Sequence, residues 1–191
     1  ASDGAARVRR TVWSALSWFG APRQVILEQA LDDQDPDVRR IAYTIMGREA
    51  ASHIDLALLA SGLKDPSPRA RVEAVRGYAA RAGGSVRCPE LFAAAVDPDL
   101  HVAVAALDLL SEECSQRTRQ VGLLAGIAAE HSAAAPRDWH RSAHALVSLA
   151  GVAPSRAEPL LSGLAQHSNP FARAYAARAA TVLGDTGVVQ S

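Results

Sequence analysis

The sequence is poor in cysteine, in aromatic residues and in lysine, and it carries no net charge. Its 191 residues include 2 cysteines, 5% aromatic residues, and 20 basic residues against 20 acidic ones. Cys88 and Cys114 form no paired metal-ligand pattern and are too few for a disulfide framework, so we expect two reduced thiols. Lys64 is the only lysine, and the other basic residues are arginines. The balanced charge argues against a protein that depends on electrostatic attraction to nucleic acid.

Long apolar runs and local catalytic motifs are also missing. No stretch approaches the roughly 18 continuous apolar residues of a membrane span, and the sequence does not start with a secretory segment. We therefore expect a soluble, cytoplasmic protein without a membrane partner. The sequence has neither a G-x-S-x-G nucleophile elbow nor a glycine-rich phosphate loop. It assigns no catalytic residue, no metal ligand and no cofactor, and whether the protein is an enzyme stays uncertain, with a non-enzyme favoured.

Alanine and a repeated turn dominate what is present. Hydrophobic residues make up 49% of the chain, and alanine is the commonest residue, which favours closely packed helices and an all-α fold. Four turn dipeptides, each preceding a helical pattern, recur along the chain: Asp35-Pro36, Ser67-Pro68, Asp97-Pro98 and Asn169-Pro170. The polar residue can cap the helix through its side-chain oxygen, and proline suits the first helical position. We expect Asp35 and Asp97 to act as such caps.

A small or apolar residue follows each turn at a constant distance, at Ala42, Ala74, Val104 and Ala176. Small side chains there would let neighbouring helices approach closely. Degenerate copies of the pattern surround Ala135-Pro136 and begin at Val8-Arg9. The pattern predicts six inner helices, at about residues 5–19, 36–49, 68–82, 98–113, 137–150 and 170–183, separated by amphipathic segments that we expect to be outer helices.

The order Asp-Pro, Val-Arg, two residues and Ala, as in residues 35–42, resembles the HEAT-repeat family, and particularly its bacterial HEAT-like, phycobilisome-lyase-type repeats. The resemblance implies a right-handed α-solenoid of about six helical hairpins, a single array over residues 1–191. Both ends look like interior repeats, so we expect a fragment of a longer protein. In the family, an inner-helix arginine bonds to turn groups and forms a ladder through the stack. The positions that match are Arg9, Arg39, Arg71 and Arg173, with His101 and His140 as departures.

The solvent side of the inner helices is the expected binding surface, because the concave face of such an array is lined by these helices. Helical periodicity, counted from core positions 38, 42, 45 and 46, places eight residues on this face. They are Arg10, Trp13, Arg40, Tyr43, Arg76, Arg141, His144 and Arg178. Arginine and aromatic side chains are the usual anchors of protein interfaces. We therefore expect a non-catalytic scaffold that binds a protein or peptide partner, although the same residues could be ordinary solvated side chains.

Two other interpretations stay open. His140 and His144 are four residues apart on one predicted helix and could reach one metal ion, but no third ligand is identified. A structural hydrogen-bonding role for His140 is preferred. The chain could also be a HEAT-like enzyme or accessory subunit that acts on nucleic acid, like an alkylpurine DNA glycosylase, or on a bound cofactor, like a lyase. The tryptophans and carboxylates available to such a glycosylase are Trp13, Trp18, Trp139, Asp108 and Asp138.

Overall fold

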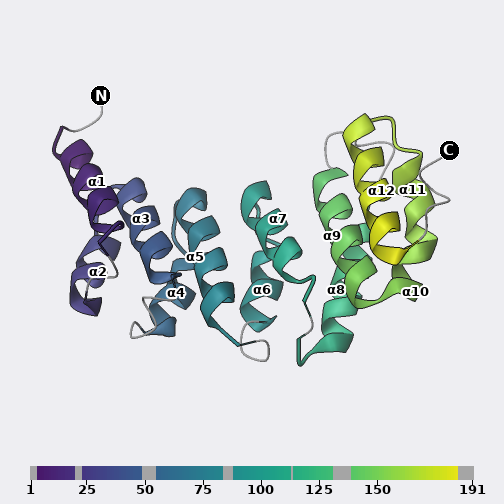
Figure 1. Ribbon diagram of the computed structural model, residues 1–191, viewed down its shortest axis with the longest axis horizontal. Helices are drawn as coiled ribbons and strands as arrows, with labels where there is room; N and C mark the ends of the chain where they lie inside the picture. Colours follow the sequence, from purple (N-terminus) through teal and green to yellow (C-terminus); the bar gives the residue numbers. More distant parts are fainter. Residues whose placement is uncertain are drawn as a thin grey trace. The chain divides into compact units, whose positions relative to one another are not determined.

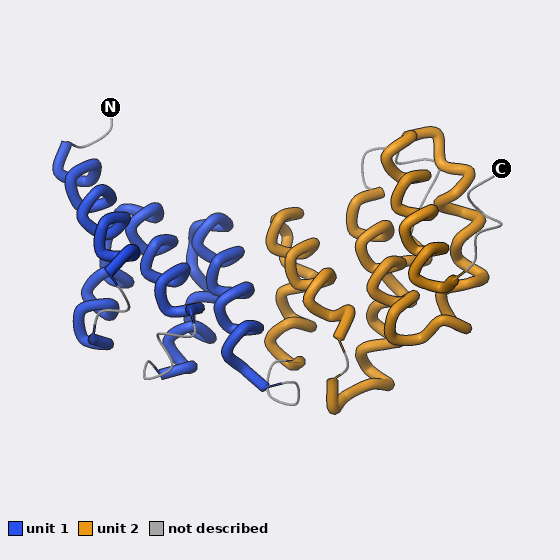
Figure 2. Tube along the Cα trace, viewed as in Figure 1, with its two compact units in different colours: residues 1–83 blue, residues 84–191 orange. Residues whose placement is uncertain are grey.

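The structure, a computed structural model, describes residues 4–19, 23–48, 55–83, 88–112, 114–130 and 139–184. Every regular element in these ranges is a helix, which confirms the predicted all-α class for this part of the chain (Figure 1). The chain divides into two compact units, residues 1–83 and residues 84–191 (Figure 2). Within the described ranges, no helix combines the length and the apolar character needed to cross a membrane.

Unit 1 is built from two layers of helices. Its elements are α1 (Gly4–Leu16), α2 (Gln24–Leu31), α3 (Pro36–Met46), α4 (Leu56–Gly62) and α5 (Pro68–Arg81). The helices α1, α3 and α5 are in the segments predicted to be inner helices, and they lie side by side (Figure 1). The helices α2 and α4 form the second layer and contact α3 and α5.

Unit 2 repeats this two-layer arrangement. Its elements are α6 (Cys88–Ala94), α7 (Leu100–Leu109), α8 (Arg117–Ala129), α9 (Trp139–Val152), α10 (Pro154–Ala157), the 3₁₀ helix η2 (Glu158–Leu160), α11 (Leu161–Ala165) and α12 (Pro170–Leu183). The helix α9 contacts α7 on one side and α12 on the other, and these three occupy predicted inner segments. The remaining helices of the unit pack against this row, as α8 does on α9 and α11 on α12.

The helix caps confirm one half of the cap prediction and correct the other. Asp35 accepts a hydrogen bond from the backbone N–H of Asp37 and caps α3, as expected. The cap of α7 is Asp99, which accepts from the N–H groups of His101 and Val102. The prediction that Asp97 caps this helix is therefore wrong. Asp97-Pro98 corresponds to Asp65-Pro66 of the preceding turn, and in each turn the aspartate lies two residues before the helix cap.

Each of these turns has an acceptor side chain two residues ahead of the cap. Asp33, Asp65 and Asp97 recur at equal intervals, and one carboxylate oxygen of each accepts the backbone N–H of the residue two positions later, at 2.8 Å. His167 does the same for Asn169 through its Nδ1 atom, at 3.0 Å. This hydrogen bond fixes the turn before the helix begins, because it orients the cap residue in an extended conformation.

The small residues of the repeat lie where helices approach most closely. Ala42, Ala74 and Ala176 have no exposed surface. In α7 the corresponding residue is Ala106, also fully buried, whereas the predicted Val104 is partly exposed. The two-residue shift has the same cause as the misplaced cap, because α7 begins two residues later than the Asp97-Pro98 pair suggested.

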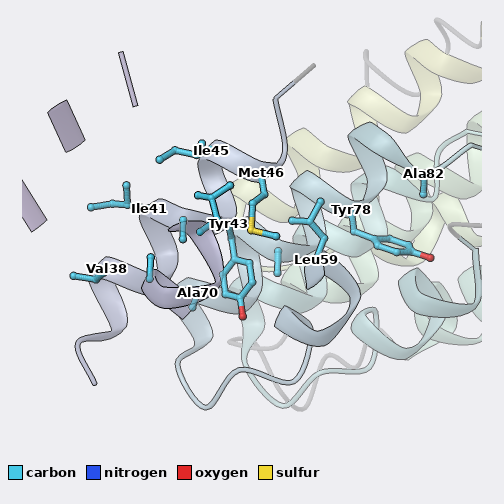
Figure 3. Packing of buried hydrophobic residues seen from close by; sticks show 13 residues of the cluster. Val38, Ile41, Tyr43, Ile45, Met46, Leu59, Ala70, Tyr78 and Ala82 are labelled. Atoms are coloured by element: carbon cyan, nitrogen blue, oxygen red, sulfur yellow. The ribbon is translucent and has the colours of Figure 1, made fainter. Parts of the chain in front are cut away.

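The core of unit 1 is a cluster of buried residues from α2, α3, α4 and α5 (Figure 3). At its edge the backbones of α3 and α5 touch at two glycines. A Cβ atom built on Gly47 would lie 2.6 Å from the Cα atom of Gly77, so neither position has room for a side chain without movement. The close approach allows Ile45, Met46 and Leu59 to be fully buried.

Candidate functional site

The arginines predicted to form a ladder all contact turn groups. Arg9 of α1 makes a two-point ion pair with Asp33, with N–O distances of 2.7 and 3.1 Å. Arg39 of α3 makes the same pair with Asp65, at 2.7 and 2.9 Å. The hydrogen bond that Arg39 donates to Asp65 raises the pKa of Arg39, and the hydrogen bond from Arg9 lowers the pKa of Asp33. Each pair joins an inner helix to the turn that begins the next inner helix.

The same arginines also satisfy backbone carbonyls. Arg39 donates to the carbonyl oxygens of Asp33 and Gln34, at 2.8 and 3.2 Å. Arg71 donates to the carbonyls of residues 65 and 66, and Arg173 to those of residues 167 and 168. These bonds lie in corresponding turns of three hairpins, and they fit the prediction that Arg39, Arg71 and Arg173 point toward turn groups. Their first role is structural.

The two histidines predicted as departures from the ladder have other surroundings. His101 is two residues from the ladder position of α7, which is Ala103, and its exposed ring lies 3.6 Å from Asp99. His140 stacks on Trp139, with 3.9 Å between the ring centres. Its Nδ1 atom is buried and has no hydrogen-bond partner among the residues that the structure describes. Neither ring therefore replaces the arginine of the other hairpins.

Arg10, Arg40 and Arg76, which were predicted on the binding face of unit 1, lie on one surface together with polar neighbours. We call this surface the unit-1 polar strip, and its residues are Arg10, Asp37, Arg40, Thr44, Glu73 and Arg76. Arg10 and Arg40 share Asp37, at N–O distances of 3.7 and 3.4 Å. Across α3 and α5, Thr44 donates to Glu73, which also pairs with Arg76 at 3.2 Å. The strip thus crosses α1, α3 and α5, and a carboxylate lies beside each of its arginines.

Arg10 also pairs with Asp35, which lies outside the strip. Its guanidinium donates to Asp35, the cap of α3, with a shortest N–O distance of 2.5 Å. This hydrogen bond is the main cause of the lowered pKa of Asp35 and of the raised pKa of Arg10. The side chain of Arg10 is still 36% exposed, close to the 37% of Arg40, while that of Arg76 is 61% exposed.

The aromatic residues predicted beside these arginines are less accessible than expected. Tyr43 is 4% exposed and belongs to the core, so its predicted place on the solvent face is wrong (Figure 3). The cause is Gly62 of α4, which leaves room for the phenol ring: a Cβ atom there would lie 2.4 Å from the Cε1 atom of Tyr43. Burial is the main reason that the pKa of Tyr43 is raised. Trp13 is half-buried and packs against the same cluster.

In unit 2 a second group of polar and aromatic side chains gathers on α7, α9 and α12. We call it the unit-2 aromatic cluster: Asp108, Trp139, His140, His144, Tyr175 and Arg178. The Nδ1 atom of His144 lies 2.6 Å from Asp108. The ring of Tyr175 lies 4.7 Å from that of His144 and 5.7 Å from that of Trp139. The three inner helices of the unit therefore meet at this cluster.

The two arginines predicted on this face differ in their partners. Arg178 lies over the ring of Tyr175, with its guanidinium carbon 6.0 Å from the ring centre, and its side chain is exposed. Arg141 donates to the backbone carbonyls of Asp97 and Pro98, at 2.6 and 3.1 Å. Of the residues predicted on the binding face of unit 2, His144 and Arg178 both contact Tyr175. Arg141 instead bonds to the turn before α7.

The imidazole pair considered for a metal ion does not form a metal site among the described residues. The Nδ1 atom of His144 is held by Asp108, and His140 stacks on Trp139. No group of three potential metal ligands occurs in the parts of the chain that the structure describes.

Sequence patterns missed several members of both surfaces. No motif distinguishes Asp37 from ordinary solvent-exposed residues, although its carboxylate pairs with both Arg10 and Arg40 in the structure. Tyr175 had no local motif at all. The rings of Trp139 and His144 that it contacts lie on α9, so only the packing of α9 against α12 identifies it.

No family model matches this sequence, and no curated protein is significantly similar to it.

Proposed function

We propose that this protein is a HEAT-like helical-repeat scaffold whose inner-helix face binds a protein or peptide partner. The observation that carries the proposal is the unit-1 polar strip, in which Arg10, Arg40 and Arg76 from three helices share one surface. Arginines that are positioned by neighbouring carboxylates and stay partly exposed are well suited to contact another protein, since less side-chain freedom is lost on binding.

The repeated turn supports the solenoid that this function needs. The acceptor side chain recurs at positions 33, 65 and 97, and the arginine-to-carbonyl bond of the following helix recurs in the turns before α3 and α5. Hairpins with the same turn and the same buried alanine stack in a regular way, and about six of them would form a right-handed α-solenoid. Such an array presents corresponding residues of successive inner helices as one extended surface.

The alternative activity on nucleic acid is less well supported by the contacts. Of the three tryptophans, Trp139 is buried, Trp13 is partly covered by the core of unit 1, and Trp18 is exposed. Asp108 is engaged by His144, and Asp138 lies outside the described residues. Each arginine of the unit-1 polar strip has a carboxylate beside it, which removes the continuous positive track that a phosphate backbone requires.

Photo-crosslinking from defined positions tests the proposed function. A photoreactive amino acid at position 44, within the unit-1 polar strip, should crosslink a partner in cells that produce the protein. The same group at the exposed Ser61 of α4 should not. With the purified partner, Arg40→Ala should weaken binding by about 1 kcal/mol or more, and Ser61→Ala should have little effect.

Two outcomes would contradict the proposal. Equal crosslinking from positions 44 and 61 would move the binding surface away from the inner helices. Strong, salt-dependent DNA binding that Arg40→Ala and Arg76→Ala abolish would favour the nucleic-acid function.

A further inference from the structure

We infer that the unit-2 aromatic cluster binds the carboxylates of an acidic peptide segment in the partner. The inference rests on the proposed scaffold function and specifies the chemistry of what is bound. Its central residues are Tyr175, Arg178 and His144, on two adjacent helices.

The first argument is that the arginines of the two surfaces differ in their partners. In the unit-1 polar strip, Asp37 and Glu73 lie within ion-pair distance of the arginines. In the unit-2 aromatic cluster, Arg178 has no carboxylate partner among the described residues, and its recorded contact is the ring of Tyr175. An exposed guanidinium without a carboxylate has its donors available to a ligand, and a planar carboxylate matches its geometry.

The second argument is the way Tyr175 is held. Its ring contacts Trp139 at 5.7 Å and His144 at 4.7 Å, and Arg178 lies on it at 6.0 Å. Trp139 is nearly fully buried and cannot move easily, while Tyr175 is half-buried. A rigid aromatic ring beside an arginine is the usual composition of an interface anchor, because both lose little conformational freedom on binding.

The third argument concerns His144. Asp108 holds its Nδ1 atom at 2.6 Å, which fixes the orientation of the ring and leaves Nε2 without a partner among the described residues. The side chain of His144 is 13% exposed, so the ring is largely enclosed, while that of Asp108 is 55% exposed. The Nε2 atom of His144 is therefore available to a ligand group that approaches Tyr175 and Arg178.

An acidic peptide fits these observations better than a nucleic acid. The cluster contains a single exposed arginine beside one half-buried tyrosine, which suits a few carboxylates on a short segment. A nucleic acid would need a track of phosphate contacts and successive stacking surfaces. The chain as a whole has no net positive charge to attract a polyanion.

Three labelled synthetic peptides of equal length test the inference with the full chain. In them glycine alternates with glutamate, with glutamine or with lysine, and binding is measured by fluorescence anisotropy. The glutamate peptide should bind, with affinity at least about tenfold above that of the other two. Arg178→Gln should weaken it by about fivefold or more. Arg156→Gln is the matched control, because Arg156 is an exposed arginine of unit 2 on α10, outside the cluster.

A second variant guards against an indirect effect of Arg178. Tyr175→Leu, with an unchanged circular dichroism spectrum and unchanged thermal unfolding, should weaken the glutamate peptide as well. Loss of binding in both variants and not in Arg156→Gln would support the inference.

The failures can be separated. Equal binding of the glutamate and glutamine peptides, or equal effects of Arg178→Gln and Arg156→Gln, would overturn the acidic-peptide inference. If the acidic-peptide inference failed but the partner crosslinked from position 44 still bound the protein, the proposed scaffold function would remain supported without it. An oligonucleotide that bound more tightly than the glutamate peptide, through Arg178, would also overturn the inference and would replace the peptide with a nucleic acid.

Discussion

Arg141 of α9 donates hydrogen bonds to the backbone carbonyls of Asp97 and Pro98 in the turn before α7. The side chain of Ala103 in α7 is too short to reach these carbonyls. In the turns before α3, α5 and α12 the corresponding carbonyls are satisfied by an arginine of the helix that follows directly, as Arg39 does for Asp33. Ala103 occupies that ladder position in α7, four residues after its cap. An arginine from the neighbouring inner helix therefore replaces the missing one, and Arg141 is primarily a structural residue.

This substitution predicts a coupling between the two positions. Arg141→Ala removes two hydrogen bonds and should lower the free energy of unfolding by about 1 to 3 kcal/mol. Ala103→Arg alone should also destabilise, because the place beside the turn is occupied. The double variant should lose at least about 1 kcal/mol less unfolding free energy than the sum of the two single losses, since the new arginine can donate to the same carbonyls. Chemical denaturation of the four proteins measures this cycle, and simple additivity would show that Arg141 does not replace the ladder arginine.

The contact between Gly47 and Gly77 predicts that alanine is harmful at both. A Cβ atom on Gly77 would lie 3.0 Å from the Gly47 Cα atom and 3.0 Å from a methyl carbon of Leu59. Overpacking costs typically about 1 to 3 kcal/mol, which should exceed the gain of about 1 kcal/mol that alanine brings inside a helix. Gly77→Ala should therefore destabilise.

Matched controls are available in α8. A Cβ atom on Gly122 or Gly126 would meet nothing within 4 Å, so alanine there should stabilise by up to about 1 kcal/mol. Thermal unfolding distinguishes these signs. A stabilising Gly77→Ala would mean that α3 and α5 can separate at no cost.

The buried alanines give a test of the helix register. Leucine in place of Ala42, Ala74 or Ala176 should destabilise by about 1 to 3 kcal/mol, because the site has no exposed surface. In α7 the same result is expected for Ala106→Leu, whereas Val104→Leu should change the unfolding free energy by less than about 0.5 kcal/mol. Urea denaturation of this pair decides between the register of the structure and the one predicted from the sequence. The reverse order of effects would restore the sequence prediction.

Acid should weaken unit 1 through two aspartates. Hydrogen bonds from Arg9 and Arg10 are the largest causes of the lowered pKa values of Asp33 and Asp35. A carboxyl group whose pKa is lower in the folded protein stabilises it at pH values above the unfolded pKa of about 3.9. This stabilisation is lost as the pH falls from the unfolded pKa through the folded one.

The measurement is the free energy of unfolding between neutral pH and about pH 3. Arg9→Gln and Arg10→Gln should each make the decrease below about pH 4 shallower, because the carboxylate loses the partner that lowers its pKa. Arg69→Gln, a change of an exposed arginine of α5, should leave the acid slope unchanged. An identical slope in all variants would show that these ion pairs contribute nothing to the acid dependence.

Local features of the sequence determined the helices and the caps at Asp35 and Asn169. These depend on residues close in sequence, where an amide hydrogen and a side-chain oxygen two positions away meet in a fixed geometry. The helical period likewise identified Ala42 as a core residue. It also placed Arg40 on an accessible face.

Tertiary structure decided which side chains the neighbouring helices cover or join. Helical periodicity gives the direction of a side chain around its own axis, but it does not show what lies opposite. Tyr43 became a core residue because Gly62 on another helix leaves space for its ring. His144, Asp108 and Tyr175 became one cluster because α7, α9 and α12 pack together, bringing into contact residues that are far apart along the chain.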